Sequence, residues 1–256
     1  YKALLHYAGA NFVPPGSRIV TGIPLHIFGS QRAQHQISDV FRKALKAPAV
    51  TVLPQGFGAL CLAISTNSAL AQGRVALVDI GSRTTELICF SDGQYLNHES
   101  AGVVLGVGQV YTQVAQKLSS QHQRPIDAYE VDWALREDKP IKIKGGVVER
   151  QALEALVQHY VRPLATRLHN EMTRLWKEGA PGIDHLLYCG GGSALLASYL
   201  GHFRDDYTIL PESQFTNAAG YLEYIRLTSK DQTRAQDQGA DDIPQGDASA
   251  QKASHA

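Results

Sequence analysis

Apolar runs of strand length alternate with stretches of helical spacing over most of this chain. Such runs predict strands at 18–22, 50–53, 75–78, 86–90, 95–100 and 185–189. Apolar residues three and four positions apart predict helices at 30–45, 58–65, 109–118, 146–177 and 194–203. Pro163 falls inside the longest helical stretch, so we expect a kink or two abutting helices there. Strands that alternate with helices indicate the α/β class, with mixed sheets flanked by helices.

Two stretches depart from this pattern. Residues 125–144 show no regular spacing and are predicted to be irregular. Residues 229–256 are rich in Gln, Asp, Ala and Ser, and Ile243 is their single large aliphatic residue. Because that composition cannot bury enough apolar surface to offset the entropy lost on ordering, we expect a disordered polar tail there.

Composition narrows the class of protein. The chain has 256 residues, 44% of them hydrophobic, which suits one large domain or two smaller ones. Lys plus Arg and Asp plus Glu both number 24, so the net charge predicts no direct binding to nucleic acid or to an acidic membrane. No apolar run approaches the roughly 20 residues of a membrane-spanning helix. The three cysteines lie far apart in apolar runs, which is typical of buried thiols in a reducing cytoplasmic compartment.

The first candidate site is a glycine loop after the strand at 75–78. The loop reads Asp79-Ile80-Gly81-Ser82-Arg83-Thr84-Thr85, and a second strand follows at once. A tight hairpin of this kind can turn backbone N–H groups toward a phosphate while its aspartate holds Mg²⁺ or the waters of that ion. The same residues also suit an ordinary turn. Because the loop enters a strand and not a helix, the P-loop and Rossmann arrangements are disfavoured.

A second glycine loop, Gly190-Gly191-Gly192-Ser193, lies between the strand at 185–189 and the helix at 194–203. Such a loop can seat a nucleotide against a helix N-terminus, or it can allow close packing. The sequence motifs of Walker ATPases, zincin metalloproteases and α/β-hydrolases do not occur. The ten histidines show no metal-ligand spacing.

Together, and in this order, the two loops resemble those of the actin, Hsp70 and sugar-kinase superfamily, and within it the plasmid-segregation actins of the ParM (StbA) type. The resemblance covers 13–227. Residues 75–86 are similar to the second phosphate loop of the family, 186–195 to its adenosine loop and 213–221 to its final connecting segment. Residues 52–60 are similar to the stretch in which a Glu or Gln positions the attacking water, which assigns that role to Gln55.

The resemblance implies an actin-like fold of two ribonuclease-H-like lobes. It divides the chain into the remainder of a first lobe (1–73), a second lobe with both glycine loops (74–211), a segment that returns to the first lobe (212–228) and the polar tail (229–256). The family's first phosphate loop, an N-terminal Asp-x-Gly hairpin, is expected upstream of Tyr1. The fold is therefore expected to be N-terminally incomplete in this sequence.

The resemblance also implies a slow ATPase coupled to filament assembly, with ATP and Mg²⁺ as its cofactors. Asp79 is the implied catalytic and metal-binding carboxylate. Residues implied to contact the nucleotide are Gly81, Ser82, Thr84, Thr85, Gly190, Gly191, Gly192 and Ser193. A neutral Gln55 can orient a water molecule but cannot accept its proton, so hydrolysis is expected to be slow.

The implied partners are other copies of the chain in a filament and a DNA-bound adaptor protein that links the filament to plasmid DNA. Direct contacts with nucleic acid or membrane are not expected. An alternative is a non-hydrolysing actin-like scaffold of the pilus-assembly or cell-shape type. A small-molecule kinase on the same fold is disfavoured, because the sequence shows no substrate-binding insertion and no acidic catalytic base.

Overall fold

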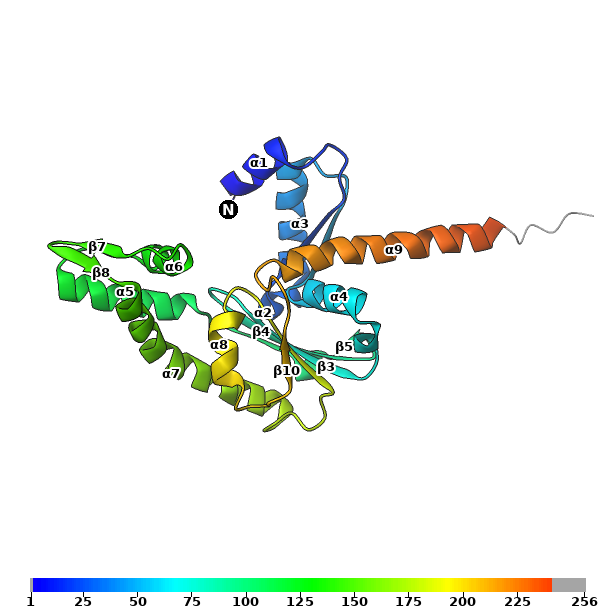
Figure 1. Ribbon diagram of the computed structural model, residues 1–256. Helices are drawn as coiled ribbons and strands as arrows, with labels where there is room; N and C mark the ends of the chain where they lie inside the picture. Colours follow the sequence, from blue (N-terminus) through cyan, green and yellow to red (C-terminus); the bar gives the residue numbers. More distant parts are fainter. Residues whose placement is uncertain (1, 241–256) are drawn as a thin grey trace, which may run out of the picture.

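A six-stranded mixed sheet forms the centre of the chain (Figure 1). The computed structural model describes residues 2–240, with side chains described as far as Thr228. In the sheet, β3 (Arg74–Ile80) pairs antiparallel with β4 (Thr85–Ser91) and parallel with β9 (His185–Cys189). Beyond β9 lies β10 (Tyr207–Ile209), while β5 (Gln94–Tyr95) and β6 (Ala101–Val103) both pair with β4. Because β3 and β9 are parallel neighbours, the two glycine loops that follow them meet at one edge of the sheet.

Both faces of β3 are buried, which explains its uninterrupted apolar run. Ala76, Val78 and Ile80 belong to the larger hydrophobic core, which contains buried residues of α5 (Gly108–His122), α7 (Arg150–Trp176) and α8 (Ser193–Leu200). Val75 and Leu77 face the opposite way, into a smaller core with residues of α4 (Phe57–Thr66). The six-stranded sheet therefore lies between two helical layers.

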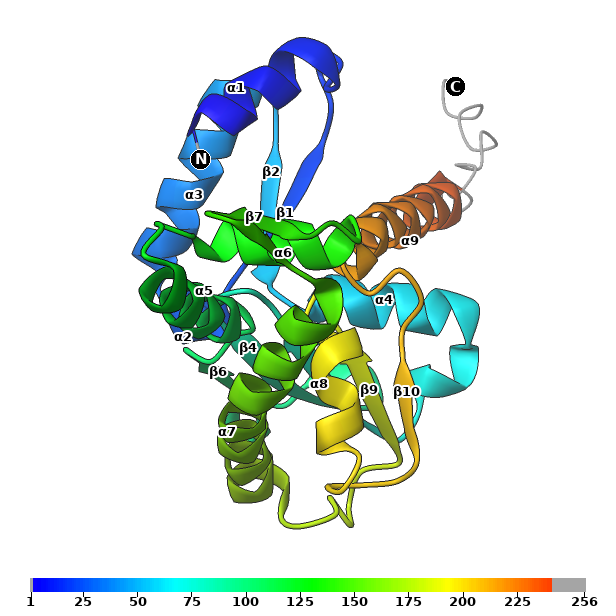
Figure 2. The same ribbon diagram turned by 60° about the vertical axis from the view of Figure 1, so that its left-hand side comes forward.

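A separate two-stranded parallel sheet lies in the N-terminal part of the described chain (Figure 2). It consists of β1 (Ile19–Ile23) and β2 (Val50–Pro54), joined by α2 (Leu25–Phe28) and α3 (Gln31–Leu45). Helix α3 begins after Ser30, whose side chain accepts a hydrogen bond from the Ala33 N–H. Helix α1 (Lys2–Asn11) packs against α3. The carboxyl end of β2 leads through Gln55 and Gly56 into α4.

Helix α9 (Thr216–Ala240) leaves the second lobe and packs along α4. The two backbones touch at Gly58 and Gly220, since a Cβ atom on Gly220 would lie 1.6 Å from the Gly58 carbonyl oxygen. The helix continues past Thr228 to Ala240, so the expectation of a disordered tail from Ser229 is wrong as far as Ala240. Its polar part, 229–240, contains three Gln, two Ala, one Lys and one Arg, residue types that propagate a helix once packing has started it. Residues 241–256 of the expected tail lie outside the described residues.

The stretch expected to be irregular, 125–144, contains regular structure. It folds into α6 (Ala128–Arg136) and β7 (Ile141–Ile143), and β7 pairs with β8 (Gly146–Val148). Asp127 caps α6 by accepting a hydrogen bond from the Glu130 N–H at 2.8 Å. These elements are too short for the spacing of their apolar residues to be recognised. Only the capping residue Asp127 could have indicated one of them, α6.

Two further expectations can be compared with the structure. The strand expected at 95–100 is interrupted, because a single 3₁₀ turn at Asn97–Glu99 separates β5 from β6. Helix α7 is one helix through Pro163, and so there are not two abutting helices. Buried Val161 and Leu164 on either side of the proline hold both halves on the same core.

Two expectations from the composition can be compared with the described chain. Cys61, Cys89 and Cys189 are buried free thiols, as expected. Within residues 2–240, none of the helices has both the length and the apolar character needed to span a membrane.

Candidate functional site

The hairpin between β3 and β4 is held rigidly against the start of α5. Its turn closes with a hydrogen bond from the Gly81 N–H to the Thr84 carbonyl at 2.9 Å. The Ser82 carbonyl accepts from the Gly108 N–H at 2.9 Å, and a Cβ atom on Gly106 would lie 2.4 Å from that same oxygen. Within the described residues, the backbone N–H groups of Ser82 and Arg83 donate to no other backbone group. This leaves amides at the tip that can bind an anion.

Asp79 lies at the buried end of β3, only 2% exposed. Its Oδ2 accepts a hydrogen bond from Asn217 Nδ2 at 2.6 Å. Burial raises the pKa of Asp79 above its ordinary value, and hydrogen bonds from Asn217 and Cys189 partly offset that rise. A bound cation would reverse the effect of burial, because it favours the charged carboxylate.

The glycine loop after β9 approaches Asp79 closely. Gly190 adopts a φ of +85°, and a Cβ atom there would lie 2.5 Å from Asp79 Oδ1 and 2.4 Å from the Ile80 carbonyl oxygen. Gly191 is exposed and lines the hollow described below. The sequence therefore needs glycine at position 190 both for its backbone conformation and for space beside the carboxylate.

Three of the residues predicted to contact the nucleotide are instead closed inside the protein. The Thr85 hydroxyl is fully buried and donates to the Leu105 carbonyl at 2.7 Å. The Ser193 hydroxyl is also buried and donates to the Gly190 carbonyl at 2.9 Å. A Cβ atom on Gly192 would collide with Val107 and Ile80, so that glycine serves packing. These three assignments are corrected: each residue shapes its loop without facing the site.

A hollow of about 370 Å³ brings five of the predicted residues together: Gln55, Asp79, Gly81, Gly190 and Gly191. Gln55 enters from the first lobe, where its N–H donates to the Ile23 carbonyl at 2.8 Å. The hollow is lined by Thr21, Gly22, Gln55, Asp79, Gly81, Gly190, Gly191, Gln214, Asn217, Ala218 and Tyr221. Both lobes and the returning helix α9 therefore contribute to one site. Thr84 is partly buried in the turn and is not among these residues.

A second hollow of about 600 Å³ shares Gly191 and Gln214 with the first. Ser82 lines this second space, together with aromatic and charged side chains of α5 and α6. Those side chains are Tyr111, Tyr129, Asp132 and Arg136. Sequence reasoning missed all four. Tyr129, Asp132 and Arg136 lie on α6, in the stretch expected to be irregular, while Tyr111 lies on the predicted helix α5 but in no recognised motif. The two hollows are therefore neighbours: Asp79 lines the first, and Ser82 lines the second together with the aromatic rings.

Sequence reasoning also missed Glu86, which is fully buried one strand away from Asp79. Its Oε2 accepts from the Leu25 N–H of α2 at 3.0 Å, whereas Oε1 has no hydrogen-bond partner within the described residues. Burial raises the pKa of Glu86 to about 7, and the charge of Asp79 contributes in the same direction. This carboxyl joins the second lobe to the first.

The residues present fit a magnesium ion that is shared with a phosphate. No cluster of three or more His, Cys, Asp or Glu side chains that could hold a metal occurs in the described chain. Mg²⁺ commonly takes one or two carboxylates and completes its shell with water and substrate phosphates. Asp79 offers one such carboxylate, and Gly190, which has no Cβ atom, leaves space beside it.

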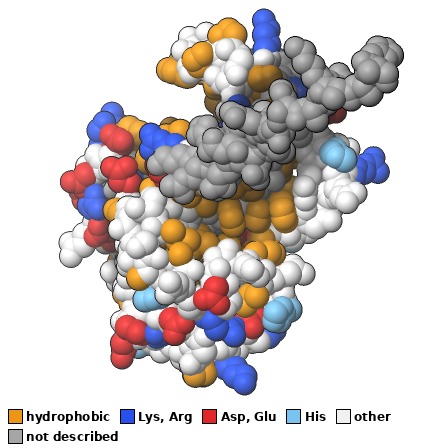
Figure 3. All heavy atoms as spheres, turned by 90° about the vertical axis from the view of Figure 1, so that its right-hand side faces the viewer, with side chains coloured by type: hydrophobic (Ala, Val, Ile, Leu, Met, Phe, Trp, Pro, Cys, Tyr) orange, Lys and Arg blue, Asp and Glu red, His pale blue; other side chains and the backbone are white. Residues whose placement is uncertain are grey.

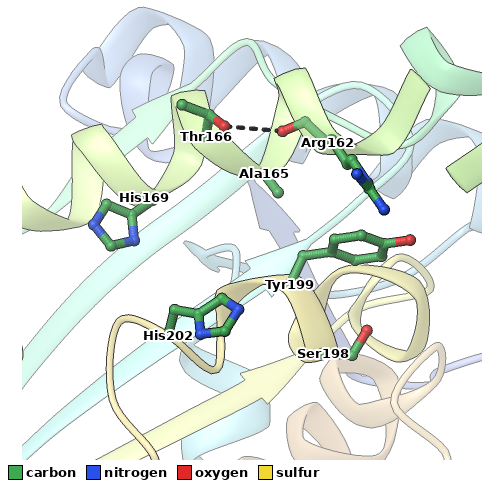
Figure 4. A pocket seen from close by; sticks show the side chains of 7 residues that line it. All are labelled: Arg162, Ala165, Thr166, His169, Ser198, Tyr199 and His202. Carbon is green, nitrogen blue, oxygen red and sulfur yellow. Dashed lines mark hydrogen bonds between the residues drawn. The ribbon is translucent and has the colours of Figure 1, made fainter. Parts of the chain in front are cut away.

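Another hollow, of about 580 Å³, lies between α7 and α8, away from every predicted site residue (Figure 4). Arg162, His169, Tyr199 and His202 line it. Nε2 of His169 lies 3.1 Å from Glu178 Oε2, and the His169 ring meets Phe203 edge to face. It shares no lining residue with the two hollows described above.

Residues 77–202 match the family model described as archaeal actin homologue MreB-like, C-terminal. No curated protein sequence matches the chain.

Among solved structures, the pCBH ParM non-polymerisable quadruple mutant is 23% identical, with a TM-score of 0.71 over 88% of this chain and 74% of that one. A 15-stranded ParM filament from Clostridium botulinum is 22% identical, with a TM-score of 0.70 over 87% of this chain and 72% of that one. An archaeal actin homologue in complex with ADP is 21% identical, with a TM-score of 0.64 over 82% of this chain and 71% of that one.

The chain therefore has the actin-like fold, as the two glycine loops led us to expect. Within that fold, the match to the MreB-like C-terminal model covers most of the second lobe, including both loops.

Proposed function

We propose that this chain binds ATP with Mg²⁺ between its lobes and assembles into filaments in that state. The observation that carries the proposal is the hollow in which Gln55, Asp79 and Gly191 meet from separate parts of the chain. A ligand in this position contacts both lobes, so its binding favours one arrangement of the lobes over others. The fold supports the proposal, since an archaeal actin homologue with the same fold is known in complex with ADP.

In the proposed complex, the phosphates lie against the tip of the hairpin. The amides of Ser82 and Arg83 donate to phosphate oxygens, and Gly81 and Gly190 leave room for them. Asp79 holds Mg²⁺, which neutralises charge on the phosphates when it is bound. The nucleoside extends into the second hollow, where the rings of Tyr111 and Tyr129 offer apolar faces to a base.

Gln55 is the proposed water-orienting residue. Its backbone is held at the end of β2 by the hydrogen bond to the Ile23 carbonyl, and its side chain lines the hollow that contains Asp79. An amide can align a water molecule, but it cannot remove the proton of that water. We therefore expect slow hydrolysis, which would delay the release of subunits from the filament.

The filament is proposed to consist of copies of this chain and to carry plasmid DNA. The similarity to a ParM filament supports assembly from copies of this chain. The resemblance to plasmid-segregation actins supports cytoplasmic transport of plasmid DNA through an adaptor protein. Because the chain has 24 basic and 24 acidic residues, the filament is expected to need that adaptor.

The test is sedimentation together with phosphate release over a series of protein concentrations, in ATP, in ADP and without nucleotide, all with Mg²⁺. The proposal predicts pelleting above a critical concentration in ATP, with phosphate appearing after assembly. Pelleting without phosphate would favour the non-hydrolysing scaffold. Neither pelleting nor phosphate at any concentration would contradict the proposal. Naked plasmid DNA added to the filaments should stay in the supernatant. Co-pelleting of this DNA would contradict the expectation that the filament needs an adaptor to bind DNA.

A further inference from the structure

The side chain of Asn217 is bonded to both lobes at once. Its Nδ2 donates to Asp79 Oδ2 at 2.6 Å, at the end of β3. Its Oδ1 accepts from the Gly56 N–H at 3.0 Å and from the Ala59 N–H at 3.2 Å, at the start of α4. Asn217 itself lies in the first turn of α9. One amide therefore ties together three elements that are far apart in the sequence.

The surroundings of Asn217 leave it little freedom. A Cβ atom on Gly58 would lie 2.4 Å from the Asn217 carbonyl oxygen, so α4 and α9 cannot slide past each other there. The Tyr221 hydroxyl occupies the space beside Gly22, where a Cβ atom would come within 1.8 Å of it. Gly56, whose N–H the amide holds, directly follows Gln55. The position of Gln55 is thereby tied to that of Asp79.

We propose that Asn217 is the positioning residue of this site, which fixes Gln55 relative to Asp79 and transmits a change at Asp79 to the start of α4. The inference rests on the proposed function, which gives Gln55 and Asp79 their roles. Only an amide suits all three bonds, because it offers a donor to the carboxylate and an acceptor to the two N–H groups. A carboxylate at 217 would repel Asp79, and an aliphatic side chain would leave three polar groups without a partner.

The same Asp79 carboxylate serves Asn217 and the proposed Mg²⁺. A cation drawn to Asp79 competes for the oxygen lone pairs that Asn217 uses. The strength of the hydrogen bonds from the Gly56 and Ala59 N–H groups to Asn217 therefore depends on what Asp79 binds. By linkage, these hydrogen bonds also affect the affinity of Asp79 for a cation. Asn217 is thus a specific contact between the two lobes, through which nucleotide binding at Asp79 changes the hydrogen bonding at the start of α4.

A double-mutant cycle on nucleotide-free protein tests the bond itself. Asn217→Asp keeps the acceptor for the two N–H groups but sets two carboxylates against each other, and adding Asp79→Asn lets the hydrogen bond form in the opposite direction. We expect Asn217→Asp to lower the folding equilibrium constant at least tenfold in urea unfolding, and the double variant to recover most of that loss. The exposed Asn170→Asp, with and without Asp79→Asn, is the matched control and should be additive. Additive effects at 217 and 79 would overturn the proposal.

Hydrogen exchange at 56–59 tests the transmission. In the natural chain, ATP with Mg²⁺ should change protection there at least threefold, whereas in Asn217→Ser it should leave protection unchanged. The serine side chain still accepts from an N–H but is too short to reach Asp79, so it also serves if Asn217→Asp does not fold. An unaltered response in Asn217→Ser overturns the proposal. If the natural chain binds no nucleotide, the proposed function fails, while the cycle still decides whether Asn217 holds Asp79.

Discussion

At the scale of single residues, the site depends on buried polar groups whose surroundings set their chemistry. Asp79 and Glu86 face each other across neighbouring strands, and each has its pKa raised, chiefly by burial. Asp79 is held by Asn217, and Glu86 by the Leu25 N–H. The two acids therefore connect the second lobe to different elements of the rest of the chain.

The role of Gln55 can be separated from that of a general base. In Gln55→Glu, a carboxylate replaces the amide and can accept the proton of the attacking water, so phosphate release should rise severalfold. In Gln55→Ala the water is no longer oriented, and release should fall at least tenfold. Phosphate release at fixed filament mass measures both. The exposed Gln116→Glu is the control, and equal rates in all four proteins would rule out Gln55 as the water-orienting residue.

Glu86 should make stability depend on pH. Burial raises its pKa from an ordinary value of 4.5 to about 7, so the folded protein keeps a proton that the unfolded chain releases. The contribution is complete below about pH 4.5, is lost as the pH rises to about 7, and amounts to about 3 kcal/mol at most. Glu86→Gln cannot ionise and should remove this slope from urea midpoints measured at pH 5 to 8. The exposed Glu137→Gln should keep it, and an unchanged slope in Glu86→Gln would assign the pH dependence to another group.

At the scale of elements, the close contact of α4 with α9 joins the returning segment to the first lobe. The contact requires glycine at both 58 and 220, since either Cβ atom would collide with backbone across the interface. Asn217 lies one turn before Gly220 on α9. The tight packing of α9 against α4 therefore fixes the position along the α9 axis from which the Asn217 side chain reaches Asp79.

Gly220→Ala reverses the usual effect of alanine in a helix. Alanine normally stabilises a helix by about 1 kcal/mol relative to glycine. Here its Cβ would lie 1.6 Å from the Gly58 carbonyl oxygen, so we expect a destabilisation of about 1–3 kcal/mol in urea unfolding. Gly29→Ala, where the Cβ meets open space, is the control and should change stability little. A stabilised Gly220→Ala protein would show that the two helices are not in contact at this point.

Much of the fold could be predicted from the sequence, because long apolar runs such as Val75–Val78 and the stripe of α7 are set by burial in the core. Apart from the helices α1 and α9, the elements missed are short. Helix α6, β7, β8 and β10 carry too few residues for a period to show, and they depend on contacts with distant parts of the chain. For the same reason Tyr129 of the second hollow went unnoticed.

The site could be predicted in part. Asp79, Gly81, Gly190 and Gly191 do come together, because they end or follow the parallel neighbours β3 and β9, and Gln55 joins them from the end of β2 in the separate sheet. Thr85 and Ser193 did not face that space, since a hydroxyl in a glycine loop suits an internal carbonyl as well as a phosphate. Asn217 was missed because its importance lies in three hydrogen bonds to distant residues, which no local pattern reveals.

At the scale of the whole molecule, residues from both lobes line one site, and apolar side chains gather on another part of the surface. Figure 3 shows apolar side chains in the middle of one face of the molecule. On the same side of the structure, Leu62, Leu210 and Phe215 line a hollow of about 350 Å³, and Phe215 is 62% exposed. The α4–α9 contact lies between this hollow and the proposed nucleotide, since both helices line the hollow and Asn217 and Tyr221 of α9 line the site.

The measurement that bears most directly on this account is equilibrium binding of ATP to the natural chain, to Asp79→Asn and to the exposed control Asp205→Asn, each with Mg²⁺ and with EDTA. The account predicts that Mg²⁺ strengthens binding to the natural chain and to the control. In Asp79→Asn, affinity in Mg²⁺ should fall at least tenfold, while affinity in EDTA should hardly change. Equal affinity of all three proteins in Mg²⁺, or no binding to the natural chain, would contradict the central claim that the hollow between the lobes is a nucleotide site.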